Sequence, residues 1–558
     1  MTKNLIILFL IVGIQLQAQD FDNIVSALGD EIKTVQSAKK EYIQSIKIIQ
    51  PGVVNVTIEE VNSKGSNSVK NYEFNTADID INTIKTITKK DVIQIQLLAN
   101  RKQKLIKLTT NHEKISFINQ LFIYAENIDN GREIVENFKK CVPLAKKITN
   151  NRLSLTTYIQ YLDWLENNVG DVNLIRKQFL QNLSVNKKFP GSIVFKSNVN
   201  SGKISKNYTY LFNLATINPN SILFKIEGEI FYIELETRRK LKTIKYFEEQ
   251  EQKNYINKFK IVCPNVENAR DLQKVLKDLI PLAQKTFNDS LTSVTSIKQG
   301  IDLINSTTKK VIINDLSIHQ NISGDCVIVF EQETLDNDKT TTEIFSFNIA
   351  DLNKNGLNYK SDGKLVYLEL FTKGGNKFIK HEKNGEQENY TKKLKIYTPE
   401  IEDAIGMKNI LSTIIDLCQK NNEYRLTKGS QKELLNILQQ NIKNVVVNNL
   451  TYDQRLEIDE ENNSLKFIST VITSKSSKEK VSEFNLSDIN SGSIKMETSG
   501  KNVMVTANTY YLEKIIKYYE DGKIKNYKNT ILIQANNIEN ARLIKHLLKE
   551  LTKNKSHK

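Results

Sequence analysis

The feature that most constrains this chain is a fourfold internal repeat. Two signatures recur at the same intervals of 138, 135 and 137 residues. The first is a Phe-Asn pair, with its phenylalanine at Phe74, Phe212, Phe347 and Phe484. The second is an amphipathic helical pattern, with its first apolar residue at Ile128, Val266, Ile401 and Ile538. Because two independent signatures share one set of intervals, the chain is predicted to contain four copies of one module.

We expect these modules over residues 19–148, 149–287, 288–422 and 423–558, after a signal peptide at 1–18. Each module begins with an amphipathic stretch, predicted to be a helix that packs near the helix closing the previous module. About seven short segments rich in β-branched residues follow, with alternating apolar and polar positions that indicate strands. The predicted class is α+β, with antiparallel strands in a barrel or sandwich.

The second signature predicts a capped C-terminal helix in every module. An asparagine occupies the N-cap position at Asn127, Asn265 and Asn537, and Glu400 takes that place in the third module. Three residues after the first apolar residue, only small side chains occur. They are Gly131, Ala269, Ala404 and Ala541. This restriction predicts that the first helical turn lies close against a sheet.

Seven strands closed by one amphipathic helix resemble the pleckstrin-homology-like superfold. The resemblance rests on element order and covers each module apart from its opening helix. It implies a small bent barrel or sandwich that binds lipid through a basic first hairpin, or peptide along a sheet edge. Among the four first turns, only the second has a lysine pair, Lys187 and Lys188, and the fourth is acidic. The phosphoinositide-binding pattern is therefore absent, and the fold alone does not assign a function.

The N-terminus has the layout of a secretory signal peptide. Lys3 precedes an apolar run from Leu5 to Ile14, and Ala18 ends a small-residue cleavage motif. A buried helix or membrane anchor is the alternative, but the run is too short to span a bilayer, which needs about 20 apolar residues. No later stretch is apolar enough to span a membrane. We therefore expect a periplasmic, cell-surface or secreted protein.

The net charge of +15 raises the question of a polyanionic partner. Nucleic acid, anionic lipid and acidic glycan are all compatible with such a surplus. However, the basic residues are spread along the chain and mixed with acidic ones, which favours a solvated lysine-rich surface. We expect no nucleic-acid partner, and either an unknown protein or an anionic cell-envelope polymer.

Catalytic motifs are not recognisable in the sequence. The five histidines show no metal-binding spacing, and there is neither a nucleophile elbow nor a P-loop. An asparagine follows the repeated phenylalanine in every copy, and Asp78, Asp351 and Asp488 recur three residues later, with Thr216 in the second copy. A hydroxyl can replace a carboxylate as a local cap but not as an acid or metal ligand, so these positions are predicted to be structural. We expect no enzyme, no cofactor and no metal.

Four cysteines in an exported chain suggest disulfides. Yet Cys141, Cys263 and Cys418 align with leucine or alanine in other copies, and Cys326 has no obvious partner in the sequence. The interpretation favoured here is four unpaired, mostly buried thiols.

The predicted function is a non-catalytic exported binding or scaffold protein, because repetition strengthens weak contacts through effective concentration. The alternative is an envelope enzyme or transport accessory with a site at a module junction. Lysine- and tyrosine-rich hairpins precede the closing helix. A purely structural role for these hairpins would be to protect a sheet edge. Their functional role would be to anchor a partner. The candidate anchors are Tyr518, Tyr519, Tyr527, Tyr246, Phe247, Tyr255 and Tyr390.

Overall fold

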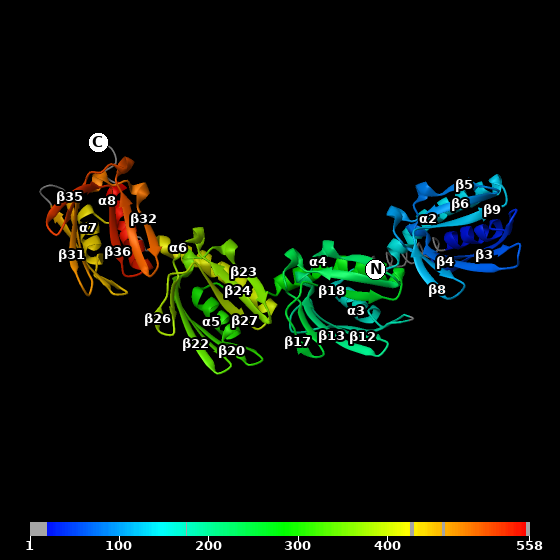
Figure 1. Cartoon of the computed structure of the whole chain (residues 1–558), viewed down its shortest axis with the longest axis horizontal. Coiled ribbons are helices and arrows are strands. Elements are labelled where there is room, and N and C mark those ends of the chain that lie inside the picture. Colours follow the sequence, from blue (N-terminus) through cyan, green and yellow to red (C-terminus); the bar gives the residue numbers. More distant parts are fainter. Residues whose placement is uncertain (1–18, 175, 425–428, 460–463, 554–558) are drawn as a thin grey trace, which may run out of the picture. The chain divides into compact units, whose positions relative to one another are not determined.

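The computed structural model describes residues 19–174, 176–424, 429–459 and 464–553 (Figure 1). The predicted signal peptide lies outside these ranges. By its contacts the chain forms two compact units. Among the described residues, the first unit contains those up to residue 252 and residues 256–288, and the second contains residues 253–255 and those from residue 289 onward. The first and second modules belong to the first unit, apart from residues 253–255, and the third and fourth modules belong to the second.

Each module has a six-stranded and a three-stranded sheet, both antiparallel. In the first module the large sheet runs β1 (Val35–Gln36), β2 (Lys40–Gln50), β3 (Val53–Asn62), β4 (Asn67–Asn75), β7 (Ile106–Thr110), β8 (Lys114–Ile118). Its small sheet is β5 (Lys85–Lys89), β6 (Val92–Leu98), β9 (Gln120–Ala125). In the second module the large sheet runs β10 (Val172–Asn173), β11 (Gln178–Val185), β12 (Ser192–Ser201), β13 (Ile204–Asn213), β16 (Lys245–Glu248), β17 (Glu251–Gln252). Its small sheet is β14 (Leu223–Glu227), β15 (Ile230–Glu236), β18 (Lys258–Cys263).

The third and fourth modules repeat this order. In the third module the large sheet runs β19 (Lys310–Ile313), β20 (Leu316–Gly324), β21 (Val327–Asp336), β22 (Lys339–Asn348), β25 (Lys380–Lys383), β26 (Glu386–Gln387), and the small sheet is β23 (Asn358–Asp362), β24 (Leu365–Phe371), β27 (Lys393–Thr398). In the fourth module the large sheet runs β28 (Val445–Val447), β29 (Leu450–Asp459), β30 (Ser464–Ile472), β31 (Ser477–Phe484), β34 (Ile516–Glu520), β35 (Lys523–Lys528), and the small sheet is β32 (Lys495–Ser499), β33 (Asn502–Asn508), β36 (Thr530–Ala535).

The mixed helix-and-sheet class is confirmed, with open sheets rather than a single closed barrel. The prediction of about seven strands per module is too low, because each module has six strands in one sheet and three in the other. One reason is that the continuous apolar segment 115–125 is two strands in different sheets. β8 ends at Ile118 in the large sheet, and β9 begins at Gln120 in the small one. The long apolar pattern hides this break, because apolar residues continue through both strands. Leu121 and Ile123 of β9 are buried in the core of the first module, whereas Phe117 of β8 packs against the core of the second.

Two helices per module fill the space beside these sheets. The opening helices are residues 19–31, α3 (Tyr158–Asn168), α5 (Ile297–Thr308) and α7 (Gln431–Asn441). The closing helices are α2 (Ile128–Asn151), α4 (Val266–Asp289), α6 (Ile401–Tyr424) and α8 (Ile538–Lys553).

The predicted caps of the closing helices are confirmed: the side chains of Asn127, Asn265 and Asn537 accept backbone N–H bonds at 2.8–2.9 Å. The close approach to a sheet is also confirmed. A Cβ on Gly131 would lie 3.0 Å from Thr86 of β5 and 3.4 Å from Ala125 of β9.

The expectation about the opening helices is wrong. Each packs on the closing helix of its own module and not on that of the previous one. In the first module, Asn137 of α2 donates to Glu31 at 2.7 Å. In the second, Tyr161 of α3 donates to Asp278 of α4 at 3.4 Å. The opening helix therefore belongs to the hydrophobic core of its own module, where Phe21, Val25 and Leu28 are buried.

A buried glutamine joins the two sheets in every module, and sequence analysis did not identify it. The Gln44 side chain of β2 donates to the Tyr124 carbonyl of β9 at 3.0 Å and accepts from the Tyr124 N–H at 2.8 Å. Three further glutamines make the same pair of bonds. They are Gln181 with Val262, Gln320 with Tyr397 and Gln454 with Gln534. We call this contact the glutamine staple.

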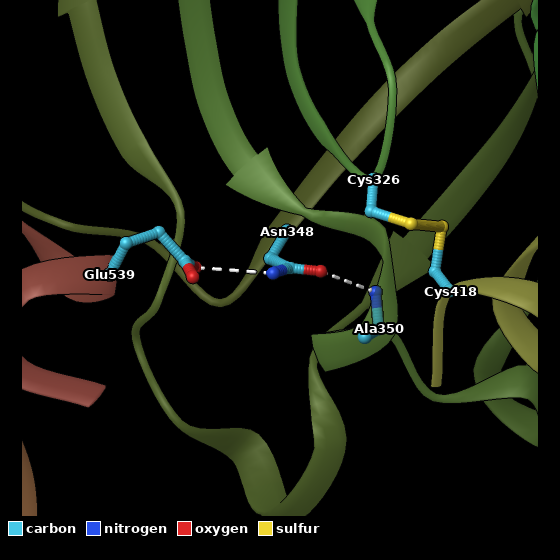
Figure 2. The surroundings of a disulfide bond; sticks show 5 residues. All are labelled: Cys326, Asn348, Ala350, Cys418 and Glu539. Atoms are coloured by element: carbon cyan, nitrogen blue, oxygen red, sulfur yellow. Dashed lines mark hydrogen bonds between the residues drawn. A yellow bond between two sulfur atoms is a disulfide. The ribbon is translucent and has the colours of Figure 1, made fainter. Parts of the chain in front are cut away.

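Two of the four cysteines are paired, which corrects the prediction of four free thiols. Cys326, beside the β20–β21 turn, forms a disulfide with Cys418 of α6 (Figure 2). Cys141 and Cys263 are free and buried, as predicted.

The physical reason can be seen in the first two modules, where a glycine and an alanine meet at this point. A Cβ on Gly52 would lie 3.7 Å from Ala145, and one on Gly191 would lie 3.5 Å from Ala283. The two backbones approach closely at this point in the first and second modules, and the same approach allows a disulfide with a Cα–Cα distance of 5.4 Å in the third. Aligning Cys418 with alanine was correct, but the alignment of Cys326 with glycine was missed.

Candidate functional site at the module junctions

The repeated asparagine caps a short turn within its own module. Asn75 ends β4, and its side-chain oxygen accepts from the Ala77 N–H at 2.9 Å. Asn213 and Asn348 make the same bond, also at 2.9 Å. The predicted structural role is therefore confirmed for these three asparagines.

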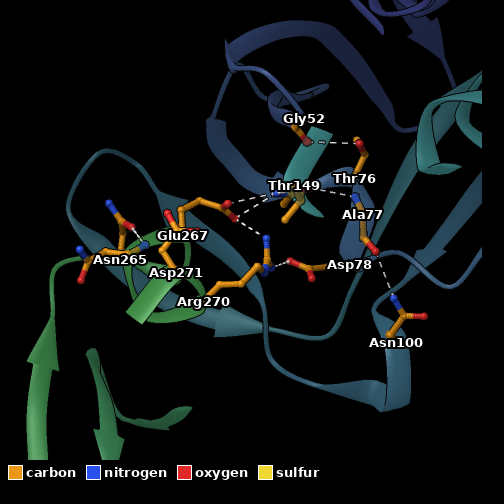
Figure 3. A network of polar contacts seen from close by, with 12 residues as sticks. Gly52, Thr76, Ala77, Asp78, Asn100, Thr149, Asn265, Glu267, Arg270 and Asp271 are labelled. Carbon is orange, nitrogen blue, oxygen red and sulfur yellow. Dashed lines mark hydrogen bonds and ion pairs between the residues drawn. The ribbon is translucent and has the colours of Figure 1, made fainter. Parts of the chain in front are cut away.

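The amide nitrogen of the same asparagine reaches the next module of its unit. Asn75 donates at 3.2 Å to both carboxylate oxygens of Glu267. Figure 3 shows Glu267 in the first turn of α4, beside Arg270. Asp78, three residues after Asn75, forms a hydrogen-bonded ion pair with Arg270 of the same helix. Predicting Asp78 as a purely local cap was wrong, because its partner lies 192 residues away.

Arginines neutralise most of the acidic charge at this junction. Arg270 binds Glu267 at 2.8 Å, and Arg152, which follows α2, binds Glu267 at 2.7 Å and Asp271 at 2.5 Å. All of these side chains are largely buried. Three carboxylates face two guanidinium groups, so the cluster carries one excess negative charge when fully ionised. Burial, only partly offset by Arg270, accordingly raises the pKa of Asp78 to about 6.

The second unit repeats this arrangement. Asn348 donates to Glu539 of α8 at 3.2 Å (Figure 2), and Arg542 of α8 bonds to Asp351 at 2.5 Å. Burial also raises the pKa of Asp351, with Arg542 opposing it. The counterparts of Asp78 and Arg270 in the second and third modules are Thr216 and Ile405, so those positions lack the pair.

An aromatic side chain accompanies the polar contacts in each unit. In the first unit, the rings of Phe117 and Phe231 meet edge to face with centroids 4.4 Å apart. In the second, Tyr390 is buried with Phe378 in the core of the fourth module, and its N–H donates to the Gly500 carbonyl at 3.0 Å. The junction therefore combines ion pairs with a buried ring.

A cavity of ≈ 340 Å³ opens beside the junction in the first unit. Its walls include the apolar side chains of Ile49, Leu105, Phe117 and Phe231. Its polar lining includes Lys107 and the carboxylates of Glu73, Glu229 and Glu267. Glu73 lies 3.4 Å from Lys107, and Glu267 is held by the arginines described above. The cavity therefore combines apolar rings with carboxylates that are mostly ion-paired.

The tyrosine-rich hairpins do not form one surface. A partner anchor must be exposed, but Tyr255 and Tyr390 are only 3% and 4% exposed, so the prediction of partner anchors is wrong for both. Tyr255 belongs by its contacts to the second unit, where it packs with Val366 and Ile401. These rings serve as anchors between elements of this chain and are unavailable to an outside partner.

The remaining candidates divide between the two faces of the large sheet, because consecutive strand residues point in opposite directions. Tyr246 and Phe247 are neighbours in β16, and Tyr518 and Tyr519 are neighbours in β34. The hydroxyl of Tyr518 donates to Glu520 at 2.9 Å, and Tyr519 donates to Glu483 at 3.3 Å. Tyr527 of β35 is 43% exposed. The pattern in sequence grouped residues that the pleat separates.

One of these faces carries a row of rings across neighbouring strands. In the second module Phe195, Tyr210 and Tyr246 are directly paired across β12, β13 and β16, with Tyr210 and Tyr246 stacked at 5.3 Å. In the third module Phe345 stacks on His381 at 4.5 Å, and His381 lies 3.0 Å from Glu343. These rows start in the core, at buried Phe195 and Phe330, so they extend the core toward the sheet edge.

Within the described ranges, no group of three or more His, Cys, Asp or Glu side chains is placed to hold a metal ion. Among the same residues, we find no helix whose length and apolarity would suit a bilayer crossing. Comparison of the chain with protein-family models, curated proteins and solved structures gave no significant match.

Proposed function

We propose that the chain is an exported, non-catalytic binding or scaffold protein built from four modules. Its ligand site is the cavity at the junction of the first and second modules. The observation that carries this proposal is the lining of that cavity, where apolar rings are combined with the ion-paired carboxylates of Glu73 and Glu267 and with Glu229 at the rim. Such a lining suits an apolar side chain of a protein partner flanked by charged groups.

Catalysis is less well supported at this junction. A general acid or base must exchange its proton with a substrate, whereas Glu267 is bound to Arg152 and Arg270. The same set of asparagine, aspartate, glutamate and arginine recurs in the second unit. Recurrence at two places supports a role in holding modules together.

The proposal also keeps the pleckstrin-homology-like fold, the module boundaries and secretion through the N-terminal signal. Support for the fold comes from the sheet pair with its closing helix. Secretion is supported by the leader sequence and by the disulfide, which persists in oxidising compartments. Sequencing the N-terminus of the exported protein tests secretion. We expect it to start at Gln19, and an unprocessed N-terminus in the envelope fraction would contradict it.

Site-specific photocrosslinking tests the ligand site. Glu229 is exposed at the rim of the cavity, and Lys203 is exposed on the β12–β13 turn of the same module. Each is replaced in turn by benzoylphenylalanine, and cells are irradiated. We expect a discrete adduct from position 229 that is absent from position 203. Filling the cavity with Ile49→Trp should abolish it.

Equal adducts at both positions, or none at 229, would refute the cavity as the binding site. The alternative function, an envelope enzyme or transport accessory at the same junction, makes a different prediction. Turnover of a small molecule that is lost in Glu229→Gln but retained in Lys203→Gln would favour it over the binding protein.

A further inference from the structure

Within each unit, two defined faces meet. The trailing face belongs to the earlier module and comprises the turn with its asparagine and aspartate and the hairpin with the buried ring. In the third module these are Asn348, Asp351, Phe378 and Tyr390. The leading face belongs to the later module and comprises the first turn of its closing helix. In the fourth module these are Ile538, Glu539 and Arg542.

The trailing face of the fourth module is open in the part of the chain that the structure describes. Asn485 is exposed, whereas Asn348 is 2% exposed. Ile515 and Tyr527 are each 43% exposed, whereas their counterparts Phe378 and Tyr390 are buried. Three junction positions that bury their side chains in the third module are therefore uncovered in the fourth.

Further apolar side chains surround this open face. Ile524 is 63% exposed, and its counterpart Gln387 donates to the Lys501 carbonyl at 3.3 Å across the junction in the second unit. Tyr511 and Leu512 are 91% and 58% exposed. Their counterparts are Arg101 with Lys102, Arg239 with Lys240, and Gly374 with Gly375. The fourth module thus places apolar residues where the others have basic residues or glycine, and exposed apolar groups of this kind mark interaction surfaces.

Among the described residues, nothing covers the leading face of the first module either. Ile128 is 56% exposed, whereas Ile538 is 7% exposed. The side chains of Asp129 and Arg132 are 85% and 72% exposed and contact each other at 2.9 Å. Their counterparts Glu539 and Arg542 contact each other in the same way while also binding Asn348 and Asp351.

The two open faces are complementary, residue by residue. Asp488 can pair with Arg132 as Asp78 does with Arg270, and Asn485 can donate to Asp129 as Asn75 does to Glu267. Tyr527 has Ile128 as its apolar partner, which corresponds to Tyr390 packing in the same core cluster as Ile538.

We propose that chains associate head to tail, with the leading face of the first module of one copy docked on the trailing face of the fourth module of another. The junction inside each unit is the template for this contact. Such an interface joins two different surfaces, so repeated association produces rings or filaments.

Charge reversal in residues 19–558 tests the proposal by sedimentation and light scattering. We expect the average mass of the wild-type protein to rise with concentration. Linked modules experience an effective concentration in the mM range. The unlinked contact is therefore sought up to roughly 1 mM. Asp488→Arg or Arg132→Asp should each shift the association midpoint at least about tenfold, and the two together should restore it, because the charges are exchanged across the same interface.

Matched controls reverse a charge on an exposed surface elsewhere. Lys203→Asp and Asp163→Arg lie on other surfaces of the second module and should leave the midpoint unchanged. A wild-type protein that stays monomeric throughout the range would overturn the proposal. So would single reversals that associate like wild type, or a double reversal without recovery. The photocrosslinking test addresses a different junction, so either proposal can fail without the other.

Discussion

The disulfide of the third module allows a perturbation copied from the other modules. Cys326→Gly together with Cys418→Ala installs the residue pair that the first two modules carry at this point. The backbone approach stays possible, so the double variant removes the crosslink with little change in packing. Cys263→Ala is the matched control, because it removes a buried thiol that forms no crosslink.

The expected loss follows from the length of the closed loop. The two cysteines are 92 residues apart. For a loop of roughly 90 residues, the chain-entropy relation gives about 16 cal/mol/K, or about 4.6 kcal/mol at 25 °C. Native-state compensation reduces such values, and removal of natural disulfides costs about 2–5 kcal/mol. We therefore expect the free energy of unfolding of the third module to fall by about 2 kcal/mol or more.

Hydrogen–deuterium exchange read by mass spectrometry assigns this loss to one module, because a multi-module chain does not unfold in a single two-state transition. Peptides from β21 and α6 should exchange at least about 30-fold faster in the double variant, and up to about three orders of magnitude faster if the full entropic value applies. Peptides from the first module should be unchanged, and Cys263→Ala should leave β21 and α6 at wild-type rates.

A thiol titration accompanies the exchange measurement. The denatured, unreduced wild-type protein should present two reactive thiols, from Cys141 and Cys263. Four reactive thiols in freshly exported protein, or unchanged exchange in the double variant, would show that the crosslink is absent or does not stabilise the module.

Three further predictions concern stability. Asp78 has a folded pKa near 6, above its unfolded value of about 3.9, so its charged form destabilises the folded junction above pH 6. Asp78→Asn should therefore leave the free energy of unfolding unchanged or raise it at pH 7.5. Its stability relative to wild type should then decrease as pH falls from 6 to 4. Denaturant melts in which the variant is less stable than wild type by the same amount at every pH would contradict the reasoning. Gln44→Leu leaves buried backbone groups unpaired and should cost about 2–4 kcal/mol of unfolding free energy. Gln96 is half-buried and its side chain bonds only to the Gln120 side chain, so Gln96→Leu should cost less than about 0.5 kcal/mol. Equal losses would exclude the staple as a stabilising contact. A Cβ on Gly300 would lie 2.8 Å from an isoleucine carbon of α6, so Gly300→Ala should destabilise the protein by about 1–2 kcal/mol. Gly406 has open space around it, so Gly406→Ala should stabilise the protein by up to about 1 kcal/mol. Thermal melts that rank the two variants in the opposite order would refute the close helix packing.

The sequence predicted what depends on local pattern. Closing helices, their asparagine caps and the small residue in the first turn follow from helical spacing and from hydrogen-bonding preferences of single residues. The glutamine staple could have been found by the same self-comparison, since a glutamine stands in the first long strand of every copy.

What was missed depends on contacts across long separations. Asp78 follows a strand at a position typical of a local cap, and only the fold brings Arg270 of another module to it. Tyr390 lies in a polar sequence typical of an exposed hairpin, yet its ring is buried against the fourth module. Predicting the disulfide required aligning Cys326 with Gly52 and Gly191. That alignment was missed because the interval between the copies differs by one residue at this point. The sequence showed that side chains in the tyrosine-rich hairpins alternate between the two faces of the sheet. It did not show which face other parts of the chain would cover.

The interleaved order of the two sheets has a consequence for how a module folds. In the first module the chain completes four strands of the large sheet, leaves it for β5 and β6 of the small one, returns for β7 and β8, and then leaves again for β9. Neither sheet can be completed before the other is begun, and β4 must wait for β7 to cover its open edge. Long-range pairing of this kind slows folding. We therefore expect each module to acquire its protection from exchange in one cooperative step, and a chain cut between β6 and β7 to form neither sheet.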